Sequence, residues 1–226
     1  MTNLFDIKGK VALITGSTHG LGMAMAKGLG QAGATIVVNG NSSQEKIDNA
    51  VAALKAEGIN AVGYKFNVTE EQEVKEAVAK IQSEVGPIDI LINNAGYGLI
   101  GGLEELTDEE AKANFEVNVF GSLNVIRKAL PYLRAQKNGH IFNISSIGGF
   151  SGGFPGFGIY CATKFAVHGF TESLYQEVKP FGINVSLVMP GYFRTSFLDG
   201  GSIVKPKTEI EAYQNVRAVQ DAHLQD

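Results

Sequence analysis

The sequence predicts an α/β fold, in which one domain covering residues 1–226 forms a doubly wound parallel β-sheet with helices on both faces. Two observations carry this prediction. Short apolar runs rich in β-branched residues alternate with longer segments of helical period, which is the pattern of strands joined by crossover helices. In addition, the 226 residues are 44% hydrophobic and no long polar linker divides them, so they suffice for one large core.

Six apolar runs supply the predicted strands. Their residues favour the buried strands of a parallel sheet, which are apolar on both faces. In chain order the strands are Val11–Thr15, Thr35–Val38, Ala61–Phe66, Ile88–Asn93, His140–Ser145 and Asn184–Met189.

Five segments between the strands have helical period and supply the predicted helices. Thr107 with Glu110, and Thr69 with Gln72, have the three-residue spacing of a helix N-cap and its N3 partner. The helices are Leu21–Ala32, Gln44–Glu57, Glu70–Val85, Asp108–Gln136 and Gly158–Lys179.

Charge and cysteine content exclude several classes of function. The chain carries 19 lysines and arginines against 23 aspartates and glutamates, a net charge of −4, so we expect neither nucleic acid nor an anionic membrane as a partner. Cys161 is the only cysteine, so no internal disulfide forms, and the amino-terminal residues lack the pattern of an export signal; a cytoplasmic protein fits both. His19, His140 and His168 do not have metal-ligand spacing, and we expect no metal.

A glycine-rich turn follows the first predicted strand. Gly16, Gly20 and Gly22 punctuate it, and a helix begins near Leu21. Glycines let the backbone turn tightly and approach a phosphate, whose charge the amino end of the following helix then stabilises. The turn predicts a binding site for a dinucleotide.

Tyr160 and Lys164 lie four residues apart in a predicted helix and therefore share one face. A tyrosine with an ordinary pKa of about 10 needs a fall of about 3 units to act as a base near neutrality, and a cation about 4 Å away supplies roughly that free energy at an effective dielectric constant of about 20. We therefore expect Lys164 to lower the pKa of Tyr160 and make it a proton-transfer group.

Together these motifs resemble the classical short-chain dehydrogenases/reductases over about residues 8–198. Beside the turn and the tyrosine–lysine pair, the resemblance rests on Asn93-Asn94-Ala95-Gly96, Asn118, Ser146 and Pro190-Gly191, in the family's order. Residues 1–96 look similar to gluconate 5-dehydrogenases, and the remainder looks similar to NADP-linked reductases of the family. The resemblance implies a Rossmann-like fold whose C-terminal part is shortened in this chain.

By this resemblance the protein is an NAD(P)-dependent enzyme that interconverts a ketone or aldehyde and an alcohol by hydride transfer. Tyr160 acts as general acid/base, Lys164 assists it and holds the cofactor, Ser146 binds the substrate oxygen, and Asn118 holds a water in a proton relay. Ser146 lies 14 positions before Tyr160, one more than the family's common spacing, which leaves Ser145 as an alternative. A catalytically silent NAD(P)-binding regulatory protein is the alternative function.

The cofactor site implied by the resemblance extends over several loops. The second strand ends without the acidic residue that grips the ribose of NAD, which favours NADP(H) and leaves NAD(H) possible. The predicted cofactor-binding residues are Gly16, Ser17, Thr18, His19, Gly20, Leu21, Gly22, Asn39, Asn41, Ser42, Asn67, Val68, Asn94, Ala95, Gly96, Tyr160, Lys164, Pro190, Gly191 and Thr195.

Apolar and aromatic side chains follow several of the motifs and predict a small-molecule substrate that is a hydrophobic ketone or secondary alcohol. The residues after Thr195, Ser196–Gly201, are expected to form part of a substrate flap, and family habit favours a homo-oligomer, either a dimer or a tetramer. The pocket candidates are Tyr97, Leu99, Ile147, Phe150, Phe154, Phe157, Tyr192 and Phe193.

Overall fold

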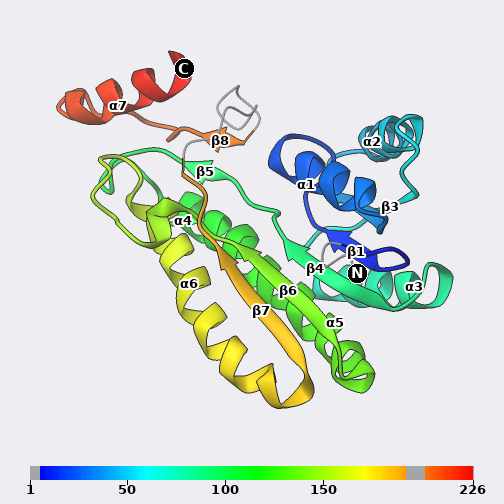
Figure 1. The fold of residues 1–226 in the computed structure, drawn as a ribbon. Helices are drawn as coiled ribbons and strands as arrows, with labels where there is room; N and C mark the ends of the chain where they lie inside the picture. The colour runs from blue at the N-terminus through cyan, green and yellow to red at the C-terminus, as the bar shows by residue number, and fades with distance from the viewer. Residues whose placement is uncertain (1–5, 192–201, 226) are drawn as a thin grey trace.

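The computed structural model describes residues 6–191 and 202–225 and has the predicted α/β architecture (Figure 1). Nearly every predicted strand and helix is present, with ends shifted by one or two residues. The elements that form the sheet and its crossovers are β1 (Val11–Ile14), α1 (Gly20–Gln31), β2 (Thr35–Gly40), α2 (Gln44–Ala56), β3 (Ala61–Lys65), α3 (Glu71–Glu84), β4 (Ile88–Asn93), α4 (Asp108–Phe115), η1 (Glu116–Gly121), α5 (Ser122–Gln136), β6 (Gly139–Ile144), α6 (Gly158–Val178) and β7 (Ile183–Val188).

Six strands form one parallel sheet in the order β3-β2-β1-β4-β6-β7. The order reverses direction at β1, which pairs with β2 on one side and β4 on the other. In such a doubly wound sheet the ligand crevice lies beyond the carboxyl ends of the strands at the reversal point. The topology therefore places the predicted glycine turn, which follows β1, at the binding crevice.

Alternate residues of β1 enter two separate hydrophobic cores. Val11 and Leu13 pack in one core with side chains of α3, α5 and α6, whereas Ala12 and Ile14 pack in the other with side chains of α1 and α2. Burial on both faces explains why the strand reads as a continuous apolar run. Helices thus cover both faces of the sheet around β1.

The long helix predicted between β4 and β6 is present over Asp108–Gln136 but is not uniform. A π-helical segment, η1, separates α4 from α5 and contains Asn118. The predicted capping box at its start is confirmed, because Thr107 and Glu110 cap each other reciprocally. The prediction for Thr69 is wrong: α3 begins at Glu71, with Glu70 at the N-cap and no side-chain cap.

A small second sheet and a C-terminal helix were not predicted. β5 (Gly98–Leu99) pairs in parallel with β8 (Ile203–Val204), and α7 (Gln214–Gln225) follows. The remaining elements are the short 3-10 helices η2 (Ile147–Gly149) and η3 (Lys179–Phe181). β5, β8 and α7 lie together at one end of the molecule, beside the first turn of α6 (Figure 1).

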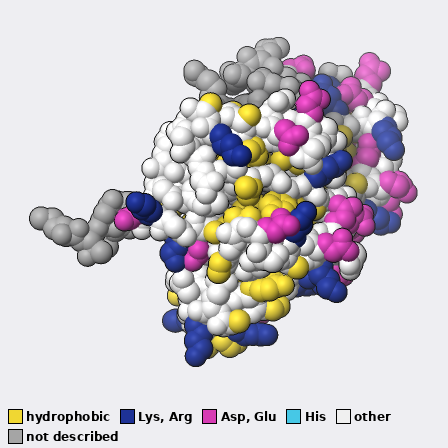
Figure 2. Space-filling model, turned by 90° about the vertical axis from the view of Figure 1, so that its right-hand side faces the viewer, with side chains coloured by type: hydrophobic (Ala, Val, Ile, Leu, Met, Phe, Trp, Pro, Cys, Tyr) yellow, Lys and Arg dark blue, Asp and Glu magenta, His cyan; other side chains and the backbone are white. Residues whose placement is uncertain are grey.

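On the face of the molecule that Figure 2 presents, cationic and anionic side chains lie side by side around a central band of hydrophobic ones. Within residues 6–191 and 202–225, no helix is long and apolar enough to cross a membrane. The same residues contain no group of three or more histidine, cysteine, aspartate or glutamate side chains that could hold a metal ion.

Candidate active site

The turn between β1 and α1 depends on its glycines. Gly16 and Gly20 have φ angles of +61° and +55°, in the left-handed region that favours glycine. A Cβ on Gly22 would lie 2.4 Å from the carbonyl oxygen of Gly16 and 2.7 Å from Nδ2 of Asn94. No side chain fits there, so the first turn of α1 lies directly against the β1 turn and faces the crevice with its backbone.

Asn39 and Ser17 brace this turn from behind. Asn39 is 2% exposed; its Oδ1 accepts a hydrogen bond from Gly16 N (3.2 Å), and its Nδ2 donates to the carbonyl oxygens of Tyr64 and Phe66. The Ser17 hydroxyl donates to the carbonyl of Ile14 (2.7 Å) and accepts from Asn39 N (3.1 Å). Both side chains therefore hold the backbone of the turn in place.

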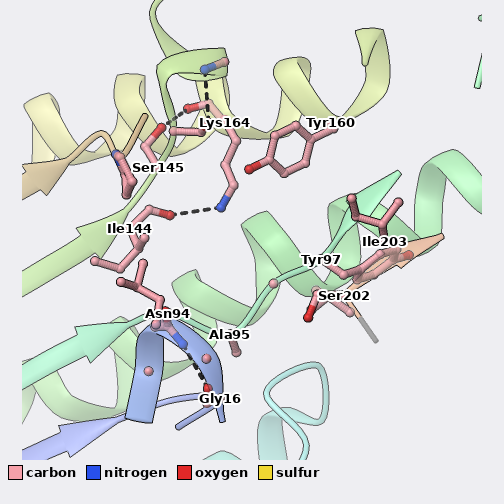
Figure 3. Close-up of a pocket in the computed structure, with 18 of the residues that line it drawn as sticks. Gly16, Asn94, Ala95, Tyr97, Ile144, Ser145, Tyr160, Lys164, Ser202 and Ile203 are labelled. Atoms are coloured by element: carbon pink, nitrogen blue, oxygen red, sulfur yellow. Dashed lines mark hydrogen bonds between the residues drawn. The ribbon is translucent and has the colours of Figure 1, made fainter. Parts of the chain in front are cut away.

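Asn94 joins the turn to the end of β4. Its Nδ2 donates to the carbonyl oxygens of Thr15 (2.9 Å) and Gly16 (3.0 Å), the second of which appears in Figure 3. In return, the Thr15 hydroxyl accepts from the backbone N–H groups of Asn94 and Ala95. The Asn-Asn-Ala-Gly segment is thus fastened to the glycine turn across the sheet.

A cavity of about 420 Å³ lies along the carboxyl ends of the strands and connects the glycine turn to α6. It brings together residues that lie at or just after the ends of β1, β2, β3, β4, β6 and β7 and are far apart in the sequence. The predicted cofactor or catalytic residues that line it are Gly16, His19, Gly20, Leu21, Gly22, Asn39, Asn41, Asn67, Val68, Asn94, Ala95, Gly96, Ser146, Tyr160, Lys164, Pro190 and Gly191.

Four predicted residues lie outside the cavity wall, and a fifth lies outside the described residues. Ser17 is fully buried in its bracing role, Thr18 bonds the ring of His19, and Ser42 is exposed beyond the end of β2. Asn118 lies behind the wall. Thr195 falls outside the described residues, as do the pocket candidates Tyr192 and Phe193 and the flap segment Ser196–Gly201.

Lys164 and Tyr160 extend from α6 into the same space (Figure 3). The lysine Nζ lies 5.7 Å from the centre of the tyrosine ring and donates a hydrogen bond to the carbonyl oxygen of Ile144 (3.0 Å). Burial lowers the pKa of Lys164 from 10.5 to about 8. The ammonium therefore lies beside the phenol, and it loses its proton at lower pH than an exposed lysine does.

The pKa of Tyr160 differs from the sequence-based expectation. Burial raises it, and the opposing hydrogen bond with Ser146 does not offset that effect. The charge of Lys164 alone predicts a lower pKa, but burial of the phenol disfavours the charged tyrosinate and raises the pKa. In this structure the protonated phenol is therefore the favoured form at neutral pH.

Ser146, not Ser145, is directed toward Tyr160. Ser146 lies on the cavity wall with Tyr160, lowers the pKa of that phenol, and accepts a hydrogen bond from the Gly148 backbone N–H (3.1 Å). Ser145 is 3% exposed, and its hydroxyl donates to the carbonyl oxygen of Lys164 (3.0 Å), as Figure 3 shows. Of the two serines, Ser146 is therefore the one whose hydroxyl is not committed to the backbone of α6, in spite of its unusual spacing.

Asn118 anchors the chain that follows β4. Its Oδ1 accepts from the backbone N–H of Tyr97 (2.9 Å), and its Nδ2 donates to the carbonyl of Tyr97 and to the hydroxyl of Thr163 (both 3.0 Å). A Cβ on Gly96 would lie 2.9 Å from the same Oδ1. The π-helical segment therefore delivers an amide that links β4, β5 and α6.

The apolar end of the cavity agrees in part with the prediction. Tyr97, Ile147, Phe154 and Phe157 line it, whereas Leu99 is buried in β5 and Phe150 is 67% exposed. Sequence reasoning missed Ser202 and Ile203, which complete the wall opposite Tyr160 (Figure 3). The only signal in the sequence was a β-branched pair, Ile203-Val204, which is too short to show a period.

The family model described as short chain dehydrogenase matches residues 10–201. The chain belongs to the short-chain dehydrogenase family. It is 50% identical over 194 residues to a 2-dehydro-3-deoxy-D-gluconate 5-dehydrogenase of Formosa agariphila, a match that covers 86% of this chain and 73% of the relative.

Solved structures of short-chain dehydrogenases have the same fold. A short-chain dehydrogenase from Streptomyces avermitilis superposes with a TM-score of 0.86 at 35% identity, covering 96% of this chain and 78% of that one. A family member from Burkholderia phymatum in complex with NAD has a TM-score of 0.85 at 29% identity, covering 99% and 82%. A metagenomic short-chain oxidoreductase in complex with NADP has a TM-score of 0.77 at 31% identity, covering 84% of each chain. This short-chain dehydrogenase is therefore an NAD(P)-dependent oxidoreductase.

Proposed function

We propose that this short-chain dehydrogenase reduces a ketone or aldehyde to an alcohol, and catalyses the reverse oxidation, with Tyr160 as the general acid/base. One observation carries the proposal. The Tyr160 phenol and the Ser146 hydroxyl line one cavity, which also contains the glycine turn. A carbonyl oxygen placed between these two hydroxyls would accept a hydrogen bond from each.

Proton transfer follows from the charges around Tyr160. Because burial raises its pKa, the phenol carries its proton at neutral pH and can donate it to a carbonyl oxygen that is becoming an alkoxide. Lys164, with a pKa of about 8, remains mostly protonated at pH 7 and stabilises the tyrosinate that results. Ser146 holds the substrate oxygen during the transfer, and Asn118 fixes the backbone of Tyr97 beside it.

The chain also offers a site that fits a nicotinamide dinucleotide. Gly22 packs against the β1 turn without a side chain, so the backbone there is open to a pyrophosphate. The amino end of α1 also favours a negative charge at this place. When bound, the nicotinamide supplies or accepts the hydride. We assign the pyrophosphate to the turn from Gly16 to Gly22, and the nicotinamide end to the residues around Lys164 and Pro190.

We favour NADP(H) over NAD(H) as the cofactor. The described wall at the end of β2 consists of Asn39, Gly40 and Asn41 and has no carboxylate to repel a ribose phosphate. Asn39 uses its amide in bracing the turn, so Asn41 is the side chain available for this contact. The Ser43 hydroxyl caps α2 by accepting from Lys46 N, which leaves Ser42 as the free neighbouring hydroxyl.

The substrate end favours a carbonyl compound with an apolar substituent. Tyr97, Ile147, Phe154, Phe157 and Ile203 surround it, and the described wall near Tyr160 contains no cation other than Lys164. A sugar acid of the kind named for the Formosa relative would require a partner for its carboxylate. We therefore propose a hydrophobic ketone or secondary alcohol.

The experiment is to follow oxidation of NADPH and NADH with a panel of sugar-acid, compact aliphatic and aryl ketones. We expect turnover of apolar ketones with NADPH. Cofactor binding without turnover across the panel would instead favour the regulatory alternative, and preferential reduction of sugar acids would contradict the proposed substrate class.

Two further proposals concern the whole protein. We propose a cytoplasmic location, since the single thiol is buried and reduced and needs no oxidising compartment. We also propose a dimer or tetramer, which is supported by the exposed aromatic side chains Phe120 and Phe165 on two helical segments that contact each other, η1 and α6. Light scattering of the purified enzyme tests the second proposal, and a monomer at micromolar concentration would contradict it.

A further inference from the structure

The wall opposite Tyr160 comes from residues 202–222, the C-terminal unit. Its β8 pairs with β5, and hydrogen bonds from Gly98 N to the Ser202 carbonyl (2.7 Å) and from Ile100 N to the Val204 carbonyl (2.9 Å) flank this pairing. A two-residue ladder is marginal alone. Further contacts must therefore hold Ser202 and Ile203 against the cavity.

A buried carboxylate provides those contacts. The Glu105 side chain has no exposed surface and lies in the loop between β5 and α4. It accepts hydrogen bonds from Gly102 N (2.6 Å) in its own loop and from Ile210 N (2.8 Å) in the C-terminal unit, and both of its oxygens bond the Arg217 guanidinium of α7. Burial raises its pKa, but these donors outweigh that effect, and the pKa lies below its ordinary value.

Arg217 extends the connection back to β5. Besides Glu105, it bonds Glu209 (2.7 Å) and the side-chain oxygen of Gln220 (2.8 Å), and its own side chain is 17% exposed. Gln220 is 1% exposed and donates to the carbonyl of Ile100 (3.3 Å). Arg217 and Gln220 thus link α7 to the end of β5, the strand that pairs with β8.

Apolar packing transmits this position to the reaction centre. Ile100, Phe157 and Cys161 form a small core, against which Ile203 of β8 and Val219 of α7 pack. Tyr160 packs against the same core. A shift of the C-terminal unit would therefore move Ile203 relative to the reactive phenol.

We propose that Glu105 and Arg217 are positioning residues whose ion pair latches the C-terminal unit in place, and that Ile203, held by this latch, sets the size of the substituent that the site accepts. The inference rests on the proposed carbonyl reduction for its functional half. Its structural half, the latch, has a readout that needs no substrate.

The first measurement is hydrogen–deuterium exchange of peptides that cover residues 97–101 and 202–206. Leaving one partner of a buried ion pair unpaired is strongly destabilising, so Arg217→Met should speed exchange of these peptides about a hundredfold. Glu105→Gln should act in the same direction, and Arg217→Lys should restore part of the protection because it keeps the charge. Peptides of β4 and β6 should exchange as in the parent.

The second measurement compares kcat and KM for a compact aliphatic ketone and a bulky aryl ketone. We expect Arg217→Met and Ile203→Ala to reduce the ratio of kcat/KM between the two ketones about tenfold, the scale of a lost apolar contact. The change should occur in KM and not in kcat. The Kd of NADPH should stay unchanged within about twofold, since the latch does not contact the turn after β1. Lys112→Met, which removes an exposed ion pair with Asp108 on α4, is the matched control.

Each outcome decides the proposal. Unchanged exchange at residues 97–101 and 202–206 in Arg217→Met would overturn the latch, as would equal acceleration in β4 and β6. Unchanged discrimination in Ile203→Ala would overturn the role of the wall. If the parent enzyme reduced no carbonyl compound, the proposed function would fail, and the exchange measurement would still decide the latch.

Discussion

The Nζ of Lys164 lies 5.7 Å from the centre of the Tyr160 ring, beside the phenol. Its hydrogen bond goes to the carbonyl oxygen of Ile144. This arrangement lets the lysine stabilise a tyrosinate while the phenol stays protonated at rest. In the proposed reaction, a phenol that is protonated at rest is ready to donate its proton to a carbonyl oxygen.

Replacing the phenol tests the assignment of the general acid. Tyr160→Phe should lower kcat about a hundredfold to ten-thousandfold, the usual contribution of general acid–base catalysis, while the Kd of NADPH changes little. Stopped-flow reduction and fluorescence titration measure the two quantities. Tyr175→Phe is the control, because Tyr175 lies on the same helix, is 39% exposed and is outside the cavity. Equal rates in Tyr160→Phe and the parent would refute the mechanism.

The buried lysine predicts an unusual dependence of stability on pH. Because the pKa of Lys164 falls from 10.5 in the unfolded chain to about 8 in the folded one, the unfolded state binds more protons between these values. The contribution of this lysine to the free energy of unfolding should therefore rise with pH over that interval and be least favourable below pH 8.

Urea denaturation of the parent and of Lys164→Met at several pH values isolates this contribution. Between pH 7 and pH 11 the stability difference should shift toward the parent by about 3 kcal/mol, as the linkage relation requires. A difference that is constant over this range would show that the lysine is not desolvated in the folded enzyme.

The preference for NADPH should depend on the neutral surface after β2. Asn41→Asp places a carboxylate on the cavity wall where a ribose phosphate is expected, and should reduce kcat/KM for NADPH relative to NADH about tenfold. Asn138→Asp adds the same charge on an exposed residue before β6 and should leave the ratio unchanged. A ratio that Asn41→Asp leaves at the parent's value would argue against the phosphate site.

Two alanine substitutions in α1 distinguish a glycine that is needed for close contact with the β1 turn from one that is not. Gly22→Ala puts a Cβ 2.4 Å from the Gly16 carbonyl oxygen and should abolish NADPH binding and lower the melting temperature. Gly28→Ala meets no atom within 4 Å and should raise stability by up to about 1 kcal/mol. Calorimetry with and without NADPH checks both, and similar behaviour of the two variants would contradict the phosphate turn.

The sequence predicted the main sheet and most of the residues that line the candidate site, because both depend on local patterns. The run Ile88–Asn93 is apolar and β-branched, and the strand has those bounds. The capping pair Thr107 and Glu110 needs only a three-residue spacing, and it is present. Sixteen of the predicted cofactor residues line one cavity, because the loops after parallel strands meet at one edge.

The remainder depends on contacts between distant segments. β5 and β8 have two residues each and form only because they pair across about a hundred residues of chain. The pKa of Tyr160 moves upward because the fold buries the phenol, which no spacing reveals. Thr69 is not the N-cap of α3. Its N–H bonds the Asn67 side chain in the turn, and the helix begins at Glu71, one residue later than predicted.

The π-helical turn at Glu116–Gly121 has a consequence for engineering this enzyme. A π-helical turn accommodates one more residue than an α-helical turn and is less stable, and here it presents the amide of Asn118 to Tyr97 and Thr163. A one-residue deletion that made the helix regular would rotate that amide out of reach while improving the helix itself. Substitutions in this turn that raise thermal stability are therefore expected to lower activity, and engineering of the enzyme should keep the π-helical turn.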